Sequence, residues 1–171
     1  MSTRTRDVLA PQATIDEAAS AATIVLIAPD LKEELPVLYL RLRDAAVKKR
    51  SKIVEITSKP TGLSPYAWKS IVVEPGKEAQ ALRDLEAGIV AQIASGSVVI
   101  VAGRANLAQS ADSVMTAVHQ AMQVAPAAKV LPVLRRGNVR GALTAGLSPR
   151  NGRDAVAILG CATAAASTSS P

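Results

Sequence analysis

The side chains that most often carry out catalysis are sparse in this sequence. There is a single histidine, His119, and a single cysteine, Cys161. A nucleophilic serine or cysteine needs a base within hydrogen-bond reach, and histidine is the usual one. His119 has no second ligand-type residue at metal-binding spacing, so we interpret it as a surface or boundary residue. Because zinc and iron–sulfur sites need several ligands, and Cys161 is alone, we predict no metal site made of cysteines and no catalytic site.

Phosphate-binding and acid–base motifs are equally scarce. The sequence has no G-x-G-x-x-G and no G-x-x-x-x-G-K-[ST]. Glu33 and Glu34 are adjacent, and adjacent helical residues do not face one site. After the first predicted strand comes Asp30, whose carboxylate would compete with a phosphate for the amides at the start of the next helix. We therefore expect that turn to cap itself.

One candidate for an anion site remains. Gly103 and Arg104 follow the fourth predicted strand, and a glycine- and arginine-rich stretch begins later with Arg135, Arg136 and Gly137. Backbone amides at glycines, combined with guanidinium groups, can bind an anion. These five residues are the only cofactor-binding candidates that the sequence offers, and the alternative is that the stretch from residue 135 wraps the sheet as an ordered arm.

Short apolar runs alternate with helical patterns along the chain. Continuous apolar runs bounded by turn signals are typical of strands that are covered on both faces of a parallel sheet. The predicted strands are 23–28, 52–57, 70–74, 97–102 and 129–134. The first main predicted helix begins after Asp30 and ends near residue 50, and the other two span 78–94 and 111–124. This order predicts an α/β fold: a three-layer, doubly wound, mostly parallel five-stranded sheet with helices on both faces.

Local signals support the individual boundaries. Thr14 and Glu17 form an S/T-x-x-E capping box, which predicts a short helix over 15–21. Pro36 fits the first turn of the helix that Asp30 caps, because its missing N–H is no loss there. Gly88 should weaken the helix over 78–94 by only about 1 kcal/mol, so we expect that helix to be continuous. Pro132 indicates an edge strand or a strand end.

Composition limits the remaining functions. Hydrophobic residues make up 49% of the chain and aromatic residues 2%, and the formal net charge is +6. The lysines and arginines lie mostly at helix ends and loops without interleaved aromatics, which favours a solvated surface or an acidic partner over nucleic acid. Trp68 and Tyr66 are interpreted as sealing a sheet edge rather than stacking on a ligand.

Three segments together resemble a known family. They are ATIDEAASAATIVLIAPDLKEELPVLYLRLRDAAVKKRSKIVEIT, VVEPGKEAQALRDL and VLRRGNVRGALTAGLSP. In this order they resemble the C-terminal half of the large iron–sulfur subunit (the G subunit) of bacterial NADH:quinone oxidoreductase, respiratory complex I. That half is itself similar to the molybdopterin oxidoreductases. The resemblance covers roughly residues 14–149 and implies a Rossmann-like domain of molybdopterin-oxidoreductase type.

The departures from the family pattern concern the cofactor. Where the cofactor-binding relatives have Gly-x-Asn-Pro, this chain has Ala28, Pro29, Asp30 and Leu31, and where they have Asp-Pro-Arg it has residues 57–59, Thr-Ser-Lys. The cysteine-rich portion that carries clusters in the family is absent from this sequence. The resemblance thus implies that the molybdopterin site is lost, that iron–sulfur clusters lie elsewhere in the large subunit, and that this chain holds no cofactor.

These observations give one expected function and two alternatives. We expect residues 1–13 to be a flexible lead-in, 14–149 the α/β domain, and 150–171 a flexible or truncated tail. The domain is expected to be a structural, cofactor-free part of the peripheral arm that supports electron transfer from NADH to quinone. Its partners would be other subunits or segments of complex I, with no nucleic acid. The first alternative is a free-standing binding domain for a nucleotide or another anionic small molecule, and the second is a basic protein that associates with nucleic acid.

The expected location follows from what the sequence lacks. No apolar run approaches the ~20 residues that a membrane span requires, and the first twelve residues lack the apolar core of a cleaved signal. A single cysteine is typical of a cytosolic chain. The resemblance implies a location at the inner face of the plasma membrane. We therefore expect a cytoplasmic, peripherally associated protein that does not insert into the bilayer.

Overall fold

A five-stranded, all-parallel sheet forms the centre of the domain. The computed structural model describes residues 11–105 and 109–134. The chain divides into two units, Met1–Val133 and Leu134–Pro171, and the described residues belong to the first of them apart from Leu134. The strands are β1 (Thr23–Ile27), β2 (Lys52–Thr57), β3 (Lys69–Val72), β4 (Val98–Ala102) and β5 (Lys129–Pro132).

The strand order defines where the chain changes direction. Across the sheet the strands lie in the order β3-β2-β1-β4-β5, and every neighbouring pair is parallel. The chain therefore winds outward from β1 through β2 to β3, then returns to the other side of β1 and continues outward to β5. The switch point lies between β1 and β4, whose registers align Thr23 with Val98 and Ile27 with Ala102.

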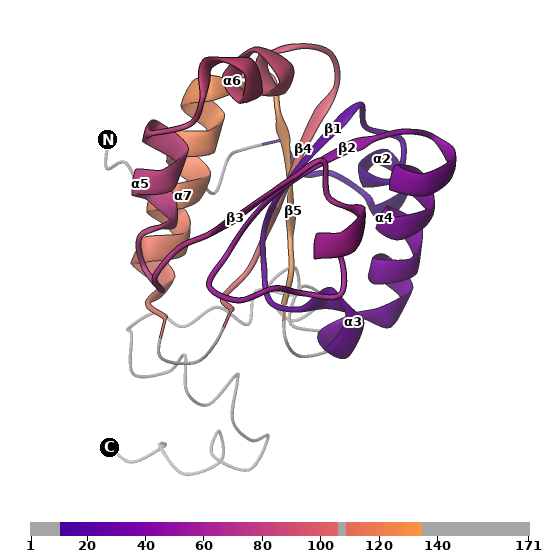
Figure 1. Cartoon of the computed structure of the whole chain (residues 1–171), viewed down its shortest axis with the longest axis horizontal. Helices are drawn as coiled ribbons and strands as arrows, with labels where there is room; N and C mark the ends of the chain where they lie inside the picture. The colour runs from indigo at the N-terminus through magenta and orange to yellow at the C-terminus, as the bar shows by residue number, and fades with distance from the viewer. Residues whose placement is uncertain (1–10, 106–108, 135–171) are drawn as a thin grey trace, which may run out of the picture. The chain divides into compact units, whose positions relative to one another are not determined.

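Helices cover both faces of the sheet. They are α2 (Ile15–Ala18), α3 (Leu31–Glu34), α4 (Pro36–Lys48), α5 (Glu78–Arg83), α6 (Ala87–Ala94) and α7 (Ala111–Val124), with a 3₁₀ turn η1 (Ser64–Tyr66). Figure 1 shows α5, α6 and α7 on one side of the sheet and α2, α3 and α4 on the other. The predicted three-layer, doubly wound α/β fold is confirmed.

Strand alternation divides the apolar core into two clusters. Val25 and Ile27 of β1 pack under α5, α6 and α7, whereas Ile24 and Leu26 pack under α2, α3 and α4. Successive side chains of a strand point to opposite faces, so a strand that is apolar throughout can fill both clusters. This explains why β1 and β4 are buried at every residue.

The predicted helix caps are confirmed, but the helix after Asp30 is not continuous. Thr14 N donates to Glu17 Oε2 at 2.7 Å, and Glu17 N donates to Thr14 Oγ1 at 3.2 Å, which completes the capping box. Asp30 caps α3, yet α3 ends at Glu34 and Pro36 begins a second helix, α4. The residue before a proline is driven out of the α region, and Leu35 has φ −141° and ψ 72°.

The prediction of one helix over 78–94 is wrong. The structure has two helices, α5 and α6, which are separated at Asp84–Glu86 rather than at Gly88. No proline or glycine lies at the break. At this place the carboxylate of Glu86 pairs with the ammonium of Lys69 on β3, 3.1 Å away, so the break coincides with a tertiary contact.

The two edges of the sheet differ. At the β5 edge, Val130 N donates to Pro11 O at 2.8 Å and Ala13 N donates to Val130 O at 2.9 Å. Residues 11–13 thus pair in parallel with β5, and the predicted edge position of Pro132 is confirmed. At the β3 edge, Trp68 is 46% exposed. The ammonium of Lys52 lies over the Trp68 ring, 4.8 Å from the ring centroid, in a cation–π contact.

Candidate functional site

The switch point between β1 and β4 is where a doubly wound sheet would bind a ligand. Ligands of such folds lie outside the carboxyl ends of the strands at the point where the strand order reverses. Here Asp30 Oδ1 accepts hydrogen bonds from Lys32 N at 3.0 Å and from Gly62 N at 3.2 Å, and Oδ2 also lies 3.2 Å from Gly62 N. The turn therefore caps itself, as expected. The same carboxylate ties the loop after β2 to the end of β1, and it places negative charge where a phosphate would approach.

Gly103 also lies at this switch point, where it is tightly enclosed. Its N–H donates to Ile27 O at 2.8 Å. A Cβ added to Gly103 would lie 2.7 Å from Val133 O and 2.9 Å from Val133 Cβ. The absence of a side chain is therefore explained by the close approach of the chain after β5. Gly103 is needed for packing whether or not an anion binds nearby.

We predict that Gly103→Ala destabilises the domain by about 1–3 kcal/mol, because the added methyl group displaces the backbone at Val133. Gly88→Ala is the matched control, since a Cβ there meets nothing within 4 Å. Inside α6 that change should stabilise by about 0.5–1 kcal/mol. Urea unfolding of both variants measures the difference. Equal effects of the two substitutions would contradict the packing explanation.

Arg104 belongs to a polar network that links two helix starts. Its Nε donates to Gln109 O at 2.8 Å, and Gln109 Nε2 donates to Glu78 Oε1 at 2.8 Å. Glu78 Oε1 also accepts from Gly76 N at 3.2 Å. Glu78 and Gln109 are buried, at 3% and 6% exposure. The network joins the start of α5 to the segment before α7. At least part of the Arg104 guanidinium is therefore used to hold this segment.

A second polar cluster was missed by the sequence analysis. Glu55 of β2 is fully buried, and its carboxylate accepts hydrogen bonds from three hydroxyl groups. Ser64 Oγ donates at 2.6 Å and Ser70 Oγ at 2.8 Å to Oε2, and Thr61 Oγ1 donates to Oε1. The only sequence signal was one charged residue inside the apolar run KIVEIT. The arrangement fastens the loop after β2 to the sheet, because the three hydroxyl groups supply the donors that a buried carboxylate needs.

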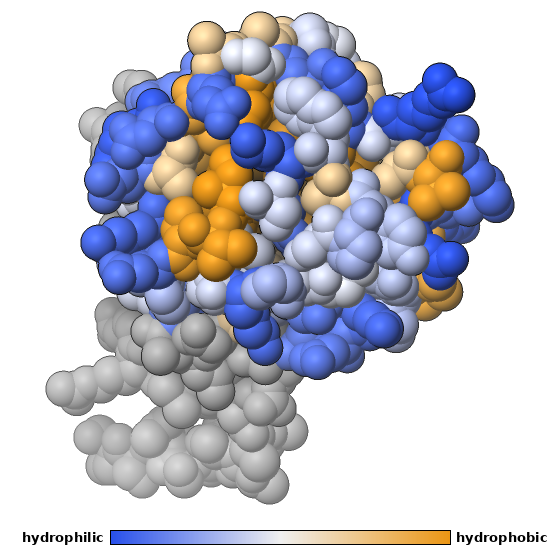
Figure 2. Space-filling model, in the orientation of Figure 1, coloured by the Kyte–Doolittle hydropathy of each residue, from blue (hydrophilic) through white to orange (hydrophobic). Residues whose placement is uncertain are grey.

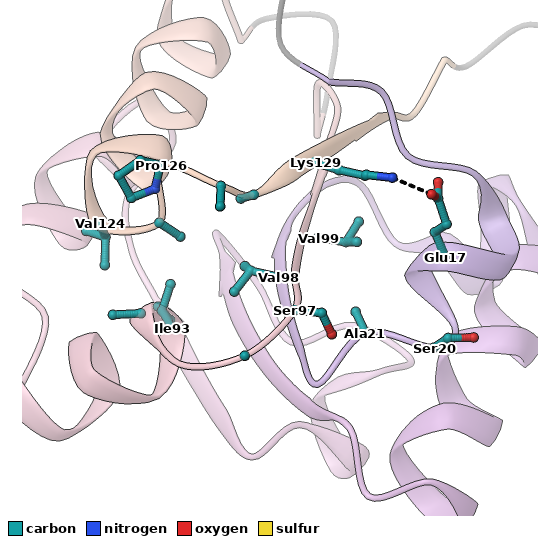
Figure 3. Close-up of a pocket in the computed structure, with 15 residues that line it drawn as sticks. Glu17, Ser20, Ala21, Ile93, Ser97, Val98, Val99, Val124, Pro126 and Lys129 are labelled. Carbon is teal, nitrogen blue, oxygen red and sulfur yellow. Dashed lines mark hydrogen bonds and ion pairs between the residues drawn. The ribbon is translucent and has the colours of Figure 1, made fainter.

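A pocket lies at the amino ends of the strands, opposite the switch point. It has a volume of about 500 Å³ and is lined by residues of α2, α6, α7, β4 and the adjoining loops. Figure 3 shows Ile93, Val124 and Pro126 on one side, and the ion pair between Glu17 and Lys129 on the other. Ser97 Oγ already accepts from Ala22 N at 2.9 Å. The pocket is thus mostly apolar, and these polar groups in its wall already have partners within the fold.

The ion pair in this wall fixes the charge state of Glu17. The hydrogen bond from Lys129, followed by the bond from the Thr14 amide, lowers the pKa of Glu17 from its ordinary value of 4.5 to about 2. Both groups are partly exposed, with side chains at 40% and 45%. A lowered pKa in the folded state means that the ionised form stabilises the fold. This contribution is complete above pH 4.5 and is lost as the pH falls towards 2.

We therefore predict that Glu17→Gln lowers stability at pH 6, and that its difference from the wild type shrinks between pH 4.5 and pH 2. Glutamine keeps a capping-box acceptor but cannot pair with Lys129 as an anion. Urea unfolding at several pH values gives the measurement. Glu33→Gln serves as the control, and a difference that stayed constant down to pH 2 would argue against the ion pair.

The remaining predicted site residues are not gathered at one place by the described structure. Arg135, Arg136 and Gly137, like Cys161, lie outside the described residues. His119 is on α7, where its Nε2 is 3.1 Å from Gln123 Nε2. Across residues 11–105 and 109–134, no group of three or more His, Cys, Asp or Glu side chains could hold a metal ion. No helix within these same ranges combines the length and apolar character that a membrane crossing requires.

Comparison with known proteins gives a clear relationship. No family model matches the chain. Two curated proteins, each named as the G subunit of NADH-quinone oxidoreductase, are 34% identical to it over 133 residues; one is from Mycobacterium bovis and one from Mycobacterium tuberculosis. The match covers 76% of this chain and 16% of each relative. The chain therefore spans about one sixth of the length of the curated relatives that it matches, and the predicted resemblance is confirmed.

Proposed function

We propose, from the premise that this chain is related by sequence to a segment of the G subunit of NADH-quinone oxidoreductase, that it is a structural domain of such a complex. In this role it carries no redox cofactor and supports electron transfer from NADH to quinone only by holding neighbouring segments in place. It would lie in the peripheral arm, on the cytoplasmic side of the membrane, in contact with other subunits.

The observation that carries the proposal is that the Asp30 side chain takes up the backbone amides at the switch point. The Asp30 carboxylate accepts from the amides of Lys32 and Gly62, at 3.0 and 3.2 Å. A phosphate or pyrophosphate would need such amides, and it would meet the negative charge of Asp30 at this position. These features support a domain that keeps a nucleotide-binding type of sheet without the nucleotide.

A second candidate is a free-standing domain that binds a nucleotide or another anionic small molecule. Arg104 and the glycine- and arginine-rich stretch 135–141 motivate it. Such a domain should gain thermal stability with ADP, inorganic phosphate or sulfate. Arg104→Gln should reduce that gain, and Asp30→Asn should increase it, because the amide removes the negative charge near the Lys32 and Gly62 amides. No stabilisation at millimolar ligand would dismiss this candidate.

One affinity purification distinguishes the two candidate functions. The tagged chain is expressed in its own host, membranes are solubilised in mild detergent, and the co-purified proteins are identified by mass spectrometry with an assay of NADH oxidation. Recovery of the flavin- and iron–sulfur-bearing subunits with that activity is the expected result. Recovery of the chain alone, as a monomer, would refute the structural role in the complex.

A further inference from the structure

Helix α4 is apolar on two opposite faces. One face packs on the sheet through Leu38, Leu42 and Ala45, all of them buried. On the opposite face Val37 is 66%, Leu40 54% and Val47 60% exposed. Residues three and seven positions apart lie on the same side of a helix. The three side chains therefore form one stripe, which we call the outer stripe, and it has no packing role within the described domain.

Charged side chains flank the outer stripe on both sides. At 100° per residue, Arg41 and Lys48 fall on one side of the stripe and Arg43 on the other. Arg41 lies 3.6 Å from Asp16, and Lys48 lies 2.7 Å from Asp44. The side chains of Arg41 and Lys48 remain 59% and 73% exposed. Together with Asp16 and Asp44, the groups along the stripe have three positive charges and two negative charges, and within the described residues Arg43 is the one cation of the three without a carboxylate beside it.

An aromatic ring extends this surface. The guanidinium of Arg43 lies 5.4 Å from the centroid of the Tyr66 ring, and Tyr66 is 37% exposed. Along α4 itself, Val37, Leu40 and Val47 line a shallow groove of about 610 Å³ together with Arg41, Arg43, Asp44 and Lys48. At the right of Figure 2, over α4, separate apolar groups lie among hydrophilic ones. Arginine and tyrosine, here Arg43 and Tyr66, are among the residues enriched at protein–protein interfaces.

We propose that the outer stripe of α4 is the docking surface for an acidic amphipathic helix of a partner chain. Apolar side chains of that helix would pack between Val37, Leu40 and Val47, and its carboxylates would face Arg41, Arg43 and Lys48. The proposal rests on the role in a multi-subunit complex and identifies which surface and which kind of partner it uses.

Charge decides between this occupant and three others. A second copy of the chain would bring the same basic groups against one another. Residues 135–171 contain five arginines and one aspartate, and residues 1–10 contain two arginines and one aspartate, so neither end complements a basic face. An anionic membrane would attract the basic groups, but Asp44 lies within the stripe and would meet like-charged head groups. A partner helix can place a basic or polar residue opposite Asp44.

The test uses the full chain in its host. Leu40→Asp and Val47→Asp are combined in the tagged protein, and Val72→Asp is the matched control, because Val72 is 58% exposed on β3. Carboxylates on the outer stripe would oppose those of the partner, so co-purified subunits should fall about tenfold or more, with the far-UV circular dichroism and unfolding midpoint unchanged. The control should retain them.

Photocrosslinking identifies the occupant. Benzoylphenylalanine at position 40 should attach to a segment of another subunit with apolar residues three or four apart and carboxylates beside them. Attachment to a second copy, to lipid or to residues 135–171 would overturn the proposal, as would equal losses from the stripe and control variants. If the wild-type chain and the double variant recover the subunits equally well, the assignment of the outer stripe as the docking surface is wrong, but the role in the complex is retained. If the wild type recovers none, both fail.

Discussion

Glu55→Ala is expected to destabilise the domain by about 2–4 kcal/mol, although the residue lies in a strand that keeps all its backbone pairing. The carboxylate is fully buried and accepts from Thr61, Ser64 and Ser70. Removing it takes the acceptor from the three hydroxyl groups, of which only that of Ser70 belongs to an exposed residue, and leaves a cavity at a fully buried position. Urea unfolding at pH 7 measures the loss in free energy of unfolding.

Two further variants distinguish the network from simple packing. Glu55→Gln keeps the volume and one carbonyl acceptor, so it should cost roughly half as much as Glu55→Ala. Ser70→Ala removes one donor, at 2.8 Å, and should cost about 1 kcal/mol. The loop at residues 58–68 should be cleaved by proteases faster in Glu55→Ala. A loss below about 1 kcal/mol together with an unchanged cleavage rate would show that the cluster does not fasten the loop.

Truncation of a leucine should destabilise the domain strongly on one face of α4 and hardly at all on the other. Leu42 is fully buried under the helix, so Leu42→Ala should cost about 2–5 kcal/mol through lost apolar burial and the cavity that remains. Leu40 is 54% exposed, so Leu40→Ala should change the stability of the isolated chain by less than about 0.5 kcal/mol. Thermal and urea unfolding of the purified variants measure both values.

This pair also checks the assignment of the outer stripe. The two substitutions have the same helix propensity and are half a turn apart on one helix, so propensity cannot account for a difference between them. If Leu40→Ala destabilised the isolated chain as strongly as Leu42→Ala, Leu40 would be part of the core. The outer stripe would then be covered within the chain itself, and no partner would be needed to explain it.

Local patterns in the sequence were sufficient for the five strands, the helix caps and the fold class, but not for the continuity of the helices after Asp30 and over 78–94. The apolar run at Thr23–Ile27 predicted a strand buried on both faces because one short segment carries the whole signal. The Thr14–Glu17 capping box and the Asp30 cap depend on residues two or three apart, and both were predicted correctly. The absence of a glycine-rich loop at the switch point was likewise visible in the residue types themselves.

Contacts between distant residues were decided only by the tertiary structure. The burial of Glu55 depends on β3 and on the loop before it, which bring Ser70 and Ser64 to its carboxylate. Gly103 needs to be glycine because of Val133, thirty positions later. The interruption between α5 and α6 coincides with Lys69 on a neighbouring strand. A sequence pattern reports which face of an element is apolar, but only packing determines which neighbour covers it. For that reason the exposed face of α4 could be recognised only once the sheet had covered the other.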